Sequence, residues 1–281
     1  MSGETALVLG CGGLTGVGWE AGIIHGLAEA GIDLTTADLV VGTSAGSVVG
    51  AQLTSGLLTP RELYERQLAG PAGEPAATLG AGLVARYAVA MMRAKDATTY
   101  RRRVGELALA ADTGDEAARR AVLEGRLVSH HWPERRFVVT AVDARTGAAA
   151  DFDRDSGVSL VDAVSASCAV PGVWPPVTVG TRRYVDGGVR SAANADVASG
   201  YRRVVVIAPV AVGSGVAPSP ATQTERLRAD GTKVLLITPS AAARKVFGRN
   251  VLDPARRAPA ARAGYAQAAA HAAEAAAVWT G

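Results

Sequence analysis

Residues 39–49 read LVVGTSAGSVV, and this stretch decides the fold. The apolar run 39–41 predicts a short buried strand, and apolar residues recur at helical spacing beyond the glycines. Between the two stands the pattern Gly42-x-Ser44-x-Gly46. A serine on a sharp strand-to-helix turn is typical of a nucleophile elbow, whose hydroxyl projects above the sheet at the positive end of the helix. A glycine-flanked turn with a capping serine is the alternative interpretation.

A second glycine-rich turn precedes the first one in the chain. Residues 6–9 form an apolar run, and residues 10–16 read GCGGLTG before a helical pattern that Gly31 ends. Such a loop points backbone N–H groups into a concavity that holds an anion, so a phosphate loop is one interpretation. The spacing differs from G-x-G-x-x-G, and no Gly-Lys-Ser/Thr follows. With a candidate nucleophile one strand away, the N–H groups of Gly12 and Gly13 are better suited to an oxyanion hole.

A third turn, Asp186-Gly187-Gly188, follows a short predicted strand at 184–185, and by itself this pattern is also that of an ordinary turn. A serine nucleophile needs a base that takes its proton. The four histidines of the chain fall on predicted helices or at a helix end, where histidine more often packs or faces solvent than catalyses. Asp186 is therefore the candidate base.

Further strands are predicted at 136–142, 148–152, 204–207 and 234–237, with a helix at 160–166 and alanine-rich helix over 255–278. Strands that alternate with helices predict a parallel sheet covered on both faces. Residues 57–135 are rich in Ala, Arg and Glu and show no convincing strand, so we interpret them as a helical excursion within a single domain, 1–281.

The composition narrows the function classes. Among 281 residues, 48% are hydrophobic and 20% charged, as in a soluble globular protein. A net charge of +3 is too small to indicate nucleic-acid binding. Two cysteines exclude a disulfide scaffold and a multi-cysteine zinc site. Without a signal peptide or an apolar run of membrane-spanning length, we expect a cytoplasmic protein, with peripheral membrane contact left open.

Three blocks, taken in order, resemble the patatin-like phospholipase family. They are residues 7–16 (LVLGCGGLTG), 41–47 (VGTSAGS) and 184–188 (YVDGG). The segment 165–176 also resembles the stretch that precedes the aspartate of the family. The resemblance is good over about 5–55 and 136–210, whereas the helical excursion and the C-terminal third match only in kind.

The resemblance implies a three-layer α/β/α sandwich with a mainly parallel sheet, and hydrolysis of fatty-acyl esters of lipids, as a phospholipase A, lysophospholipase or lipase does. It implies a dyad of Ser44 and Asp186, and no metal or cofactor. Carried over by position, the oxyanion glycines are Gly12 and Gly13, and the glycines of the elbow and the aspartate motif are Gly42, Gly46, Gly187 and Gly188. Where the family usually has Arg or Lys, this chain has Thr15, which favours a neutral ester or a lysolipid as substrate.

Other functions stay open at this point. A Ser-His-Asp esterase of the α/β-hydrolase type would use Ser44, Asp186 and His271. A catalytically inactive acyl-binding module and an acyltransferase also fit the motifs. The partner in every case is a lipid or acyl ester, and the sequence gives no oligomeric state.

Two features of the helical excursion have alternative interpretations. Val84, Tyr87, Ala88, Met91 and Met92 share a helical face, which either packs on the sheet or lines an acyl pocket. Residues 101–103, three arginines, form either a solvated helix face or a contact with anionic lipid.

Overall fold

The computed structural model describes residues 4–69 and 76–280. Its described strands form one eight-stranded sheet in the order β5-β6-β3-β2-β1-β7-β8, with β4 paired to β3. The strands are β1 (Thr5–Leu9), β2 (Leu39–Thr43), β3 (Arg136–Asp143), β4 (Ala149–Phe152), β5 (Val177–Val179), β6 (Arg182–Asp186), β7 (Arg203–Ile207) and β8 (Lys233–Ile237). Neighbouring pairs among β1, β2, β3, β7 and β8 are parallel, whereas β4, β5 and β6 pair antiparallel.

The central strands are buried on both faces. In β1, Leu7 and Leu9 join the larger hydrophobic core on one side of the sheet, while Ala6 and Val8 join a second core on the other side. All four side chains are fully buried. Strands covered on both faces read as continuous apolar runs, so the short runs of the sequence predicted them correctly.

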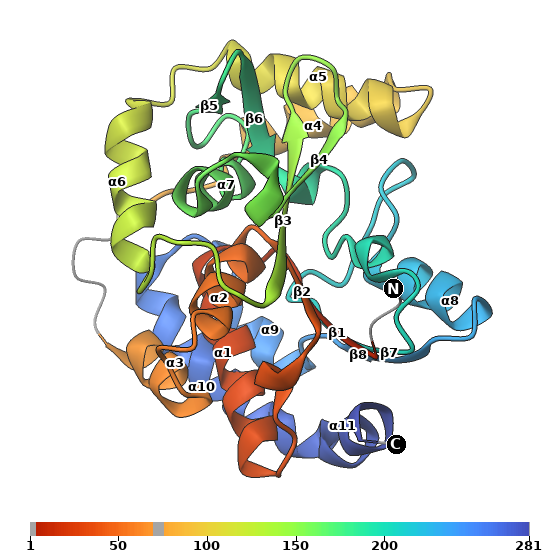
Figure 1. The fold of residues 1–281 in the computed structure, drawn as a ribbon. Helices are drawn as coiled ribbons and strands as arrows, with labels where there is room; N and C mark the ends of the chain where they lie inside the picture. The colour runs from red at the N-terminus through yellow and green to blue at the C-terminus, as the bar shows by residue number, and fades with distance from the viewer. Residues whose placement is uncertain (1–3, 70–75, 281) are drawn as a thin grey trace.

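Helices form a layer on each face of this sheet (Figure 1). One face carries α1 (Gly13–Glu29), α2 (Ala45–Thr54), α7 (Leu160–Ser167), α9 (Ala241–Phe247), α10 (Arg257–Ala268) and α11 (Ala272–Trp279). The opposite face carries α5 (Ala97–Leu109) and α8 (Pro220–Ala229), together with the short helix Ala195–Ala198. The fold is thus the α/β/α sandwich that the sequence predicts.

Helices α1 and α10 pack unusually closely. A Cβ atom at Gly18 or Gly22 would collide with backbone atoms of α10, and one at Gly264 would collide with the backbone of α1. Small residues that let helix backbones approach leave no room for substitution. This contact holds α1, and with it the turn at its N-terminus, firmly on the sheet.

The described part of the excursion between 57 and 135 consists of helices and the loops that join them, without a strand. It contains α3 (Pro60–Leu68), α4 (Ala81–Met92), α5 and α6 (Glu116–Arg126). On α4, Val84 and Met92 are exposed, so the expectation that this face packs on the sheet is wrong. Tyr87 instead turns toward the cavity at the end of the sheet, as the acyl-pocket interpretation requires.

Within the described residues, no helix combines the length and the apolar character that crossing a bilayer requires.

Candidate active site

Ser44 occupies a strained turn between β2 and α2. Its φ of +52° lies in the left-handed region, which a residue with a side chain rarely adopts. The Ser44 carbonyl accepts hydrogen bonds from the N–H groups of Ser47 (2.9 Å) and Val48 (3.3 Å), and so starts the helix. The Ser44 N–H donates to Ser167 Oγ on α7 at 2.8 Å. These bonds fix a conformation that the isolated chain would avoid.

The glycines that flank Ser44 lie where neighbouring backbone atoms leave no room for a side chain. A Cβ at Gly46 would meet the carbonyl of Leu9 in β1, and a Cβ at Gly42 would meet Ser47 Cα at 2.6 Å. Because the turn doubles back so tightly, no larger residue fits at either position. The alternative interpretation of a capping serine is wrong, because the Ser44 side chain makes no capping hydrogen bond to α2.

Asp186, the last residue of β6, is brought to Ser44 by the sheet. Strand β6 pairs antiparallel with β3, which lies next to β2, so the ends of β6 and β2 come together. The Ser44 side chain and the buried Asp186 carboxylate border the same cavity, and the Gly188 N–H donates to Asp186 Oδ1 at 2.7 Å. Gly187 packs against Thr140 of β3 and Gly188 against Cys11, each without space for a side chain.

The carboxyl group of Asp186 is a stronger proton acceptor than an ordinary aspartate. Burial raises its pKa from 3.8 to about 6, and the hydrogen bonds from Ser44 and Gly188 limit the rise. At neutral pH the group is still ionised, and it has the basicity that a general base needs.

The turn that contains Gly12 and Gly13 borders the same cavity as Ser44 and Asp186. The N–H groups of Gly12 and Gly13 bond to no acceptor in the described part of the chain, so they are available to an anion. Gly13 has a φ of +59°, and a Cβ there would meet the Val251 carbonyl. The side chain of Thr15 is fully buried and its hydroxyl donates to the Gly12 carbonyl at 3.2 Å, so it stiffens this turn and does not reach the cavity.

Asn194 is a residue of the site that the sequence analysis missed. Its fully buried side-chain amide lies 3.0 Å from Thr43 Oγ1, 3.1 Å from Thr140 Oγ1 and 3.2 Å from the Gly187 carbonyl. One side chain thus contacts the residue before Ser44 and the residue after Asp186. The signal in the sequence is weak: a lone asparagine in the small-residue run SAANADVA.

Two cavities meet at Ser44, and the first is largely apolar. It has a volume of about 260 Å³ and is bounded by Ser44, Asp186 and the glycine turn on one side. The helical excursion closes the other side with Leu79, Tyr87, Tyr100 and Val104. The Tyr87 hydroxyl donates a hydrogen bond to the Pro171 carbonyl, which holds α4 over this cavity.

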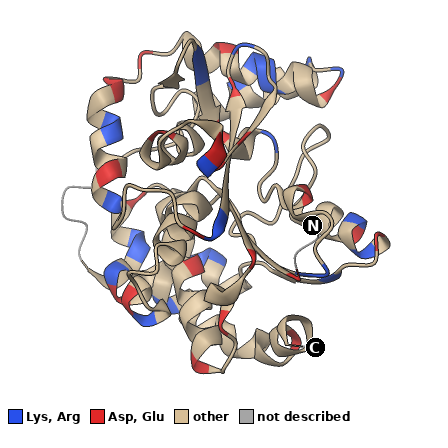
Figure 2. Ribbon diagram, in the orientation of Figure 1, with Lys and Arg blue, Asp and Glu red and all other residues tan. Residues whose placement is uncertain are grey.

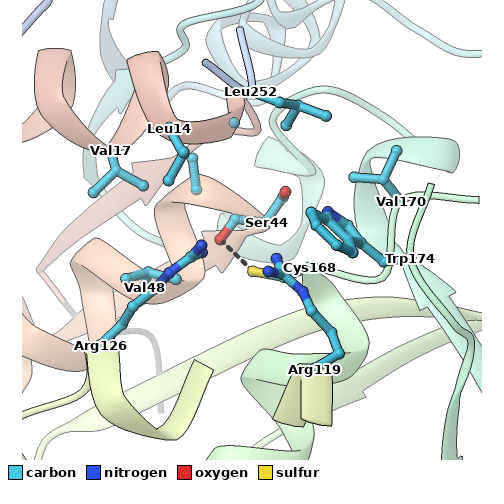
Figure 3. Close-up of a pocket in the computed structure, with 12 residues that line it drawn as sticks. Leu14, Val17, Ser44, Val48, Arg119, Arg126, Cys168, Val170, Trp174 and Leu252 are labelled. Atoms are coloured by element: carbon cyan, nitrogen blue, oxygen red, sulfur yellow. Dashed lines mark hydrogen bonds between the residues drawn. The ribbon is translucent and has the colours of Figure 1, made fainter. Parts of the chain in front are cut away.

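The second cavity is bordered by arginines of α6. Figure 3 shows Arg119 and Arg126 extending toward Ser44, with Leu14 and Val17 across from them, and Val48 also lines this cavity. The Arg119 guanidinium lies 3.8 Å above the ring of Trp174, which fixes its direction. Beyond Arg126, the cavity continues into a space of about 270 Å³ that Arg66 and Arg257 also border.

Both cysteines of the chain lie near Ser44 as free thiols. Cys168 Sγ lies 3.4 Å from the Ser44 carbonyl, and burial raises its pKa to about 11. Burial and the charge of Asp186 also raise the pKa of Cys11. Both groups therefore stay protonated at neutral pH and act as packing, not as nucleophiles.

The histidine of the proposed triad is elsewhere. His271 lies between α10 and α11, where its Nε2 is 3.1 Å from Gln267 Nε2, and it borders neither cavity at Ser44. His25 is stacked between Tyr64 and Tyr265. The structure therefore does not bring His271 to Ser44, as the triad alternative requires. No cluster of His, Cys, Asp and Glu suited to a metal occurs in the described residues.

A comparison with protein families decides the classification. The model of the family described as patatin-like phospholipase matches residues 7–199, which include all three glycine turns. The chain belongs to the patatin-like phospholipase family. The resemblance seen in the three motifs is thereby confirmed, and with it a lipid hydrolase as the general class.

Two solved structures are similar to the patatin-like chain. VipD from Legionella pneumophila matches at 11% identity and a TM-score of 0.46, over 98% of this chain and 67% of that one. The type III effector protein ExoU matches at 13% identity and a TM-score of 0.41, over 98% of this chain and 53% of that one. The chain thus spans about half the length of ExoU. A search of curated proteins gave no match.

Proposed function

We propose that this chain is a serine hydrolase that cleaves fatty-acyl ester bonds of lipids, with Ser44 as nucleophile and Asp186 as general base. The observation that carries the proposal is that buried Ser44 and Asp186 border one cavity together with the Gly12–Gly13 turn. Burial raises the pKa of Asp186 to about 6, which suits a general base. The family membership and the apolar cavity beside Ser44 support a fatty-acyl group as the part of the substrate that is recognised.

The proposed reaction has two steps. In the first, Asp186 takes the Ser44 proton while Ser44 Oγ attacks the ester carbonyl, and the N–H groups of Gly12 and Gly13 stabilise the negative oxygen. The alcohol leaves with the proton from Asp186, and the acyl group stays on Ser44. In the second step, Asp186 takes a proton from water, which attacks the acyl-enzyme, and the fatty acid leaves as Ser44 recovers its proton.

The two cavities suggest how the substrate lies. We propose that the acyl chain occupies the apolar cavity under Tyr87 and that the leaving group faces Arg119 and Arg126. Guanidinium groups favour phosphate, which they bind through two parallel hydrogen bonds. The positive charge that Thr15 does not supply is then supplied by α6, and the substrate is a phospholipid or lysophospholipid.

Hydrolysis of p-nitrophenyl esters of increasing acyl length tests the reaction. The wild type should prefer longer chains, Ser44→Ala and Asp186→Asn should lose nearly all activity, and His271→Ala should retain it. An inert wild type, or full activity in Asp186→Asn, would contradict the proposal. Equal loss in His271→Ala would restore the triad.

A pair of substrates tests the orientation. Arg126→Ser should raise KM for a lysophospholipid about tenfold, because a charge-assisted bond is worth roughly 1.5–3 kcal/mol, and should leave KM for a neutral monoacylglycerol unchanged. Arg135→Ser is the matched control, since Arg135 donates to the Ala37 carbonyl away from both cavities. Equal KM changes for the two lipids would place the headgroup elsewhere.

A further inference from the structure

Helix α4 is apolar in sequence but exposed in the structure. Its twelve residues, Ala81–Met92, contain one charged side chain, Arg86, and only Ala90 is buried. Among its side chains, Val84 is 50% exposed, Val89 39% and Met92 75%. A helix that presents large aliphatic side chains to water forgoes the burial that ordinarily stabilises it.

The two faces of α4 have different surroundings. Tyr87 points inward, where its hydroxyl binds the Pro171 carbonyl, and Leu83 packs against Gly172. At about 100° per residue, Val84, Val89 and Met92 fall within roughly 140° of one another on the other side. One helix therefore has an inner face toward Ser44 and an outer apolar face toward solvent.

The outer face continues into an open groove between α4 and α5. This groove has a volume of about 440 Å³ and a mainly apolar floor. Arg86, Arg93 and Arg103 stand around it. Neither Arg86 nor Arg93 forms an ion pair with any residue that the structure describes, and the one acidic residue at the groove, Glu106, is paired with Arg102.

The charge of the two helices differs from that of the rest of the chain. Residues 81–109 contain six basic and two acidic side chains, a net charge of +4, while the whole chain has a net charge of +3. Figure 2 shows basic residues on α5 and on the loop that joins it to α4. A helix that lies in the headgroup region of an anionic membrane typically combines exposed apolar side chains with basic residues at their border, as α4 does.

We propose that the outer face of α4 and the groove between α4 and α5 dock on an anionic lipid surface. The inference rests on the proposed lipid hydrolase, because the inner side of the same helices, with Tyr87, Tyr100 and Val104, borders the cavity of Ser44. Docking through Val84, Val89 and Met92 places α4, whose inner side borders that cavity, against the lipid from which the acyl chain is taken.

Binding to vesicles tests the surface without turnover. The Ser44→Ala protein is mixed with vesicles of phosphatidylcholine, or of phosphatidylcholine with phosphatidylglycerol, and the bound fraction is measured by sedimentation. We expect binding to the anionic vesicles that salt weakens. Adding Met92→Asp should reduce it at least tenfold, and Arg86→Ser and Arg93→Ser about fivefold each, the value of one cation at such a surface.

Leu57→Asp is the matched control, since Leu57 is 63% exposed and lies outside α4 and α5. It should change binding less than twofold. Failure of the parent protein to bind anionic vesicles, or equal effects of Met92→Asp and Leu57→Asp, would overturn the proposal. Equal binding of the parent protein to vesicles of phosphatidylcholine alone and to anionic vesicles would overturn it as well.

Activity separates this surface from the reaction itself. In protein with Ser44 intact, Met92→Asp should lower the rate on anionic phospholipid vesicles at least tenfold and leave the rate on a soluble short-chain ester within twofold. Equal loss on both substrates would overturn the docking surface. Vesicle binding through α4 by a protein that hydrolyses no ester would instead contradict only the proposed function.

Discussion

The turn around Ser44 and the helices α4 and α5 border the same cavity, and they are built in opposite ways. Ser44 and Asp186 are each 5% exposed, and their backbone and side chains are hydrogen-bonded to β3, α7 and Gly188. On α4, by contrast, only Ala90 is buried, and among the described residues a single side-chain hydrogen bond, from Tyr87, ties the helix to the site. The comparison teaches that the sheet fixes the two proposed catalytic residues, whereas the helix on the other side of the cavity is largely exposed.

Glycine positions give the largest expected contrast. Gly13→Ala should lower kcat about a hundredfold. Gly13 has a φ of +59°, and the added Cβ would meet the Val251 carbonyl, so the turn must shift and displace the N–H groups that face the oxyanion. Gly82→Ala on α4, where a Cβ meets nothing within 4 Å, should change kcat less than twofold. Steady-state kinetics on a short-chain ester measures both. Similar losses in the two variants would show that the regions are not held differently.

Asp186→Asn should stabilise the protein while abolishing its activity. The folded state raises the Asp186 pKa from 3.8 to about 6, so above pH 6 the buried charge costs on the order of 2–3 kcal/mol of stability. Below pH 3.8 the carboxyl group is protonated in both folded and unfolded states and the cost disappears. Denaturant unfolding should therefore show a gain above pH 6 that fades toward pH 4. A gain that does not vary with pH would contradict the raised pKa.

Asn194→Ala should have a smaller effect, on both activity and stability. It removes the amide that contacts Thr43, Thr140 and the Gly187 carbonyl, and an unsatisfied buried group costs roughly 1–3 kcal/mol. We expect kcat to fall about tenfold with little change in KM. The control Asn250→Ala removes the hydrogen bond that its side chain donates to the Ala77 carbonyl and the one that it accepts from the Leu252 N–H, both part-buried, and should lower kcat less than Asn194→Ala does. A change in KM alone for Asn194→Ala would show that Asn194 does not position the pair.

The sheet and its three turns could be predicted because each has a local cause. Short apolar runs such as 39–41 are buried on both faces of the sheet. The flanking glycines are required because backbone atoms pass too close for a side chain, and the glycines are visible in the sequence pattern itself. The same local information predicts Ser44, whereas Asp186 follows from the need for a base and from the order of the motifs in the family resemblance.

Other parts of the site depend on contacts that no local pattern contains. Asn194 acts through Thr43 and Thr140, which are distant in the sequence and meet only across β2 and β3. Arg119 and Arg126 border the cavity at Ser44 because α6 packs on α7, so the residue at position 15 does not by itself determine the charge around Ser44. The exposed face of α4 contradicts the rule that apolar helix faces pack on a sheet, and only the structure shows which side is covered.

Labelling of Ser44 by a fluorophosphonate at different pH values tests the central claim most directly. If Asp186 activates Ser44, the labelling rate should rise with pH through a midpoint near 6, and Asp186→Asn should lower it by at least a hundredfold at pH 7. Ser44→Ala should remain unlabelled. A wild-type protein that does not react, or a rate that Asp186→Asn leaves unchanged, would contradict the account of Ser44 and Asp186 as one reacting pair.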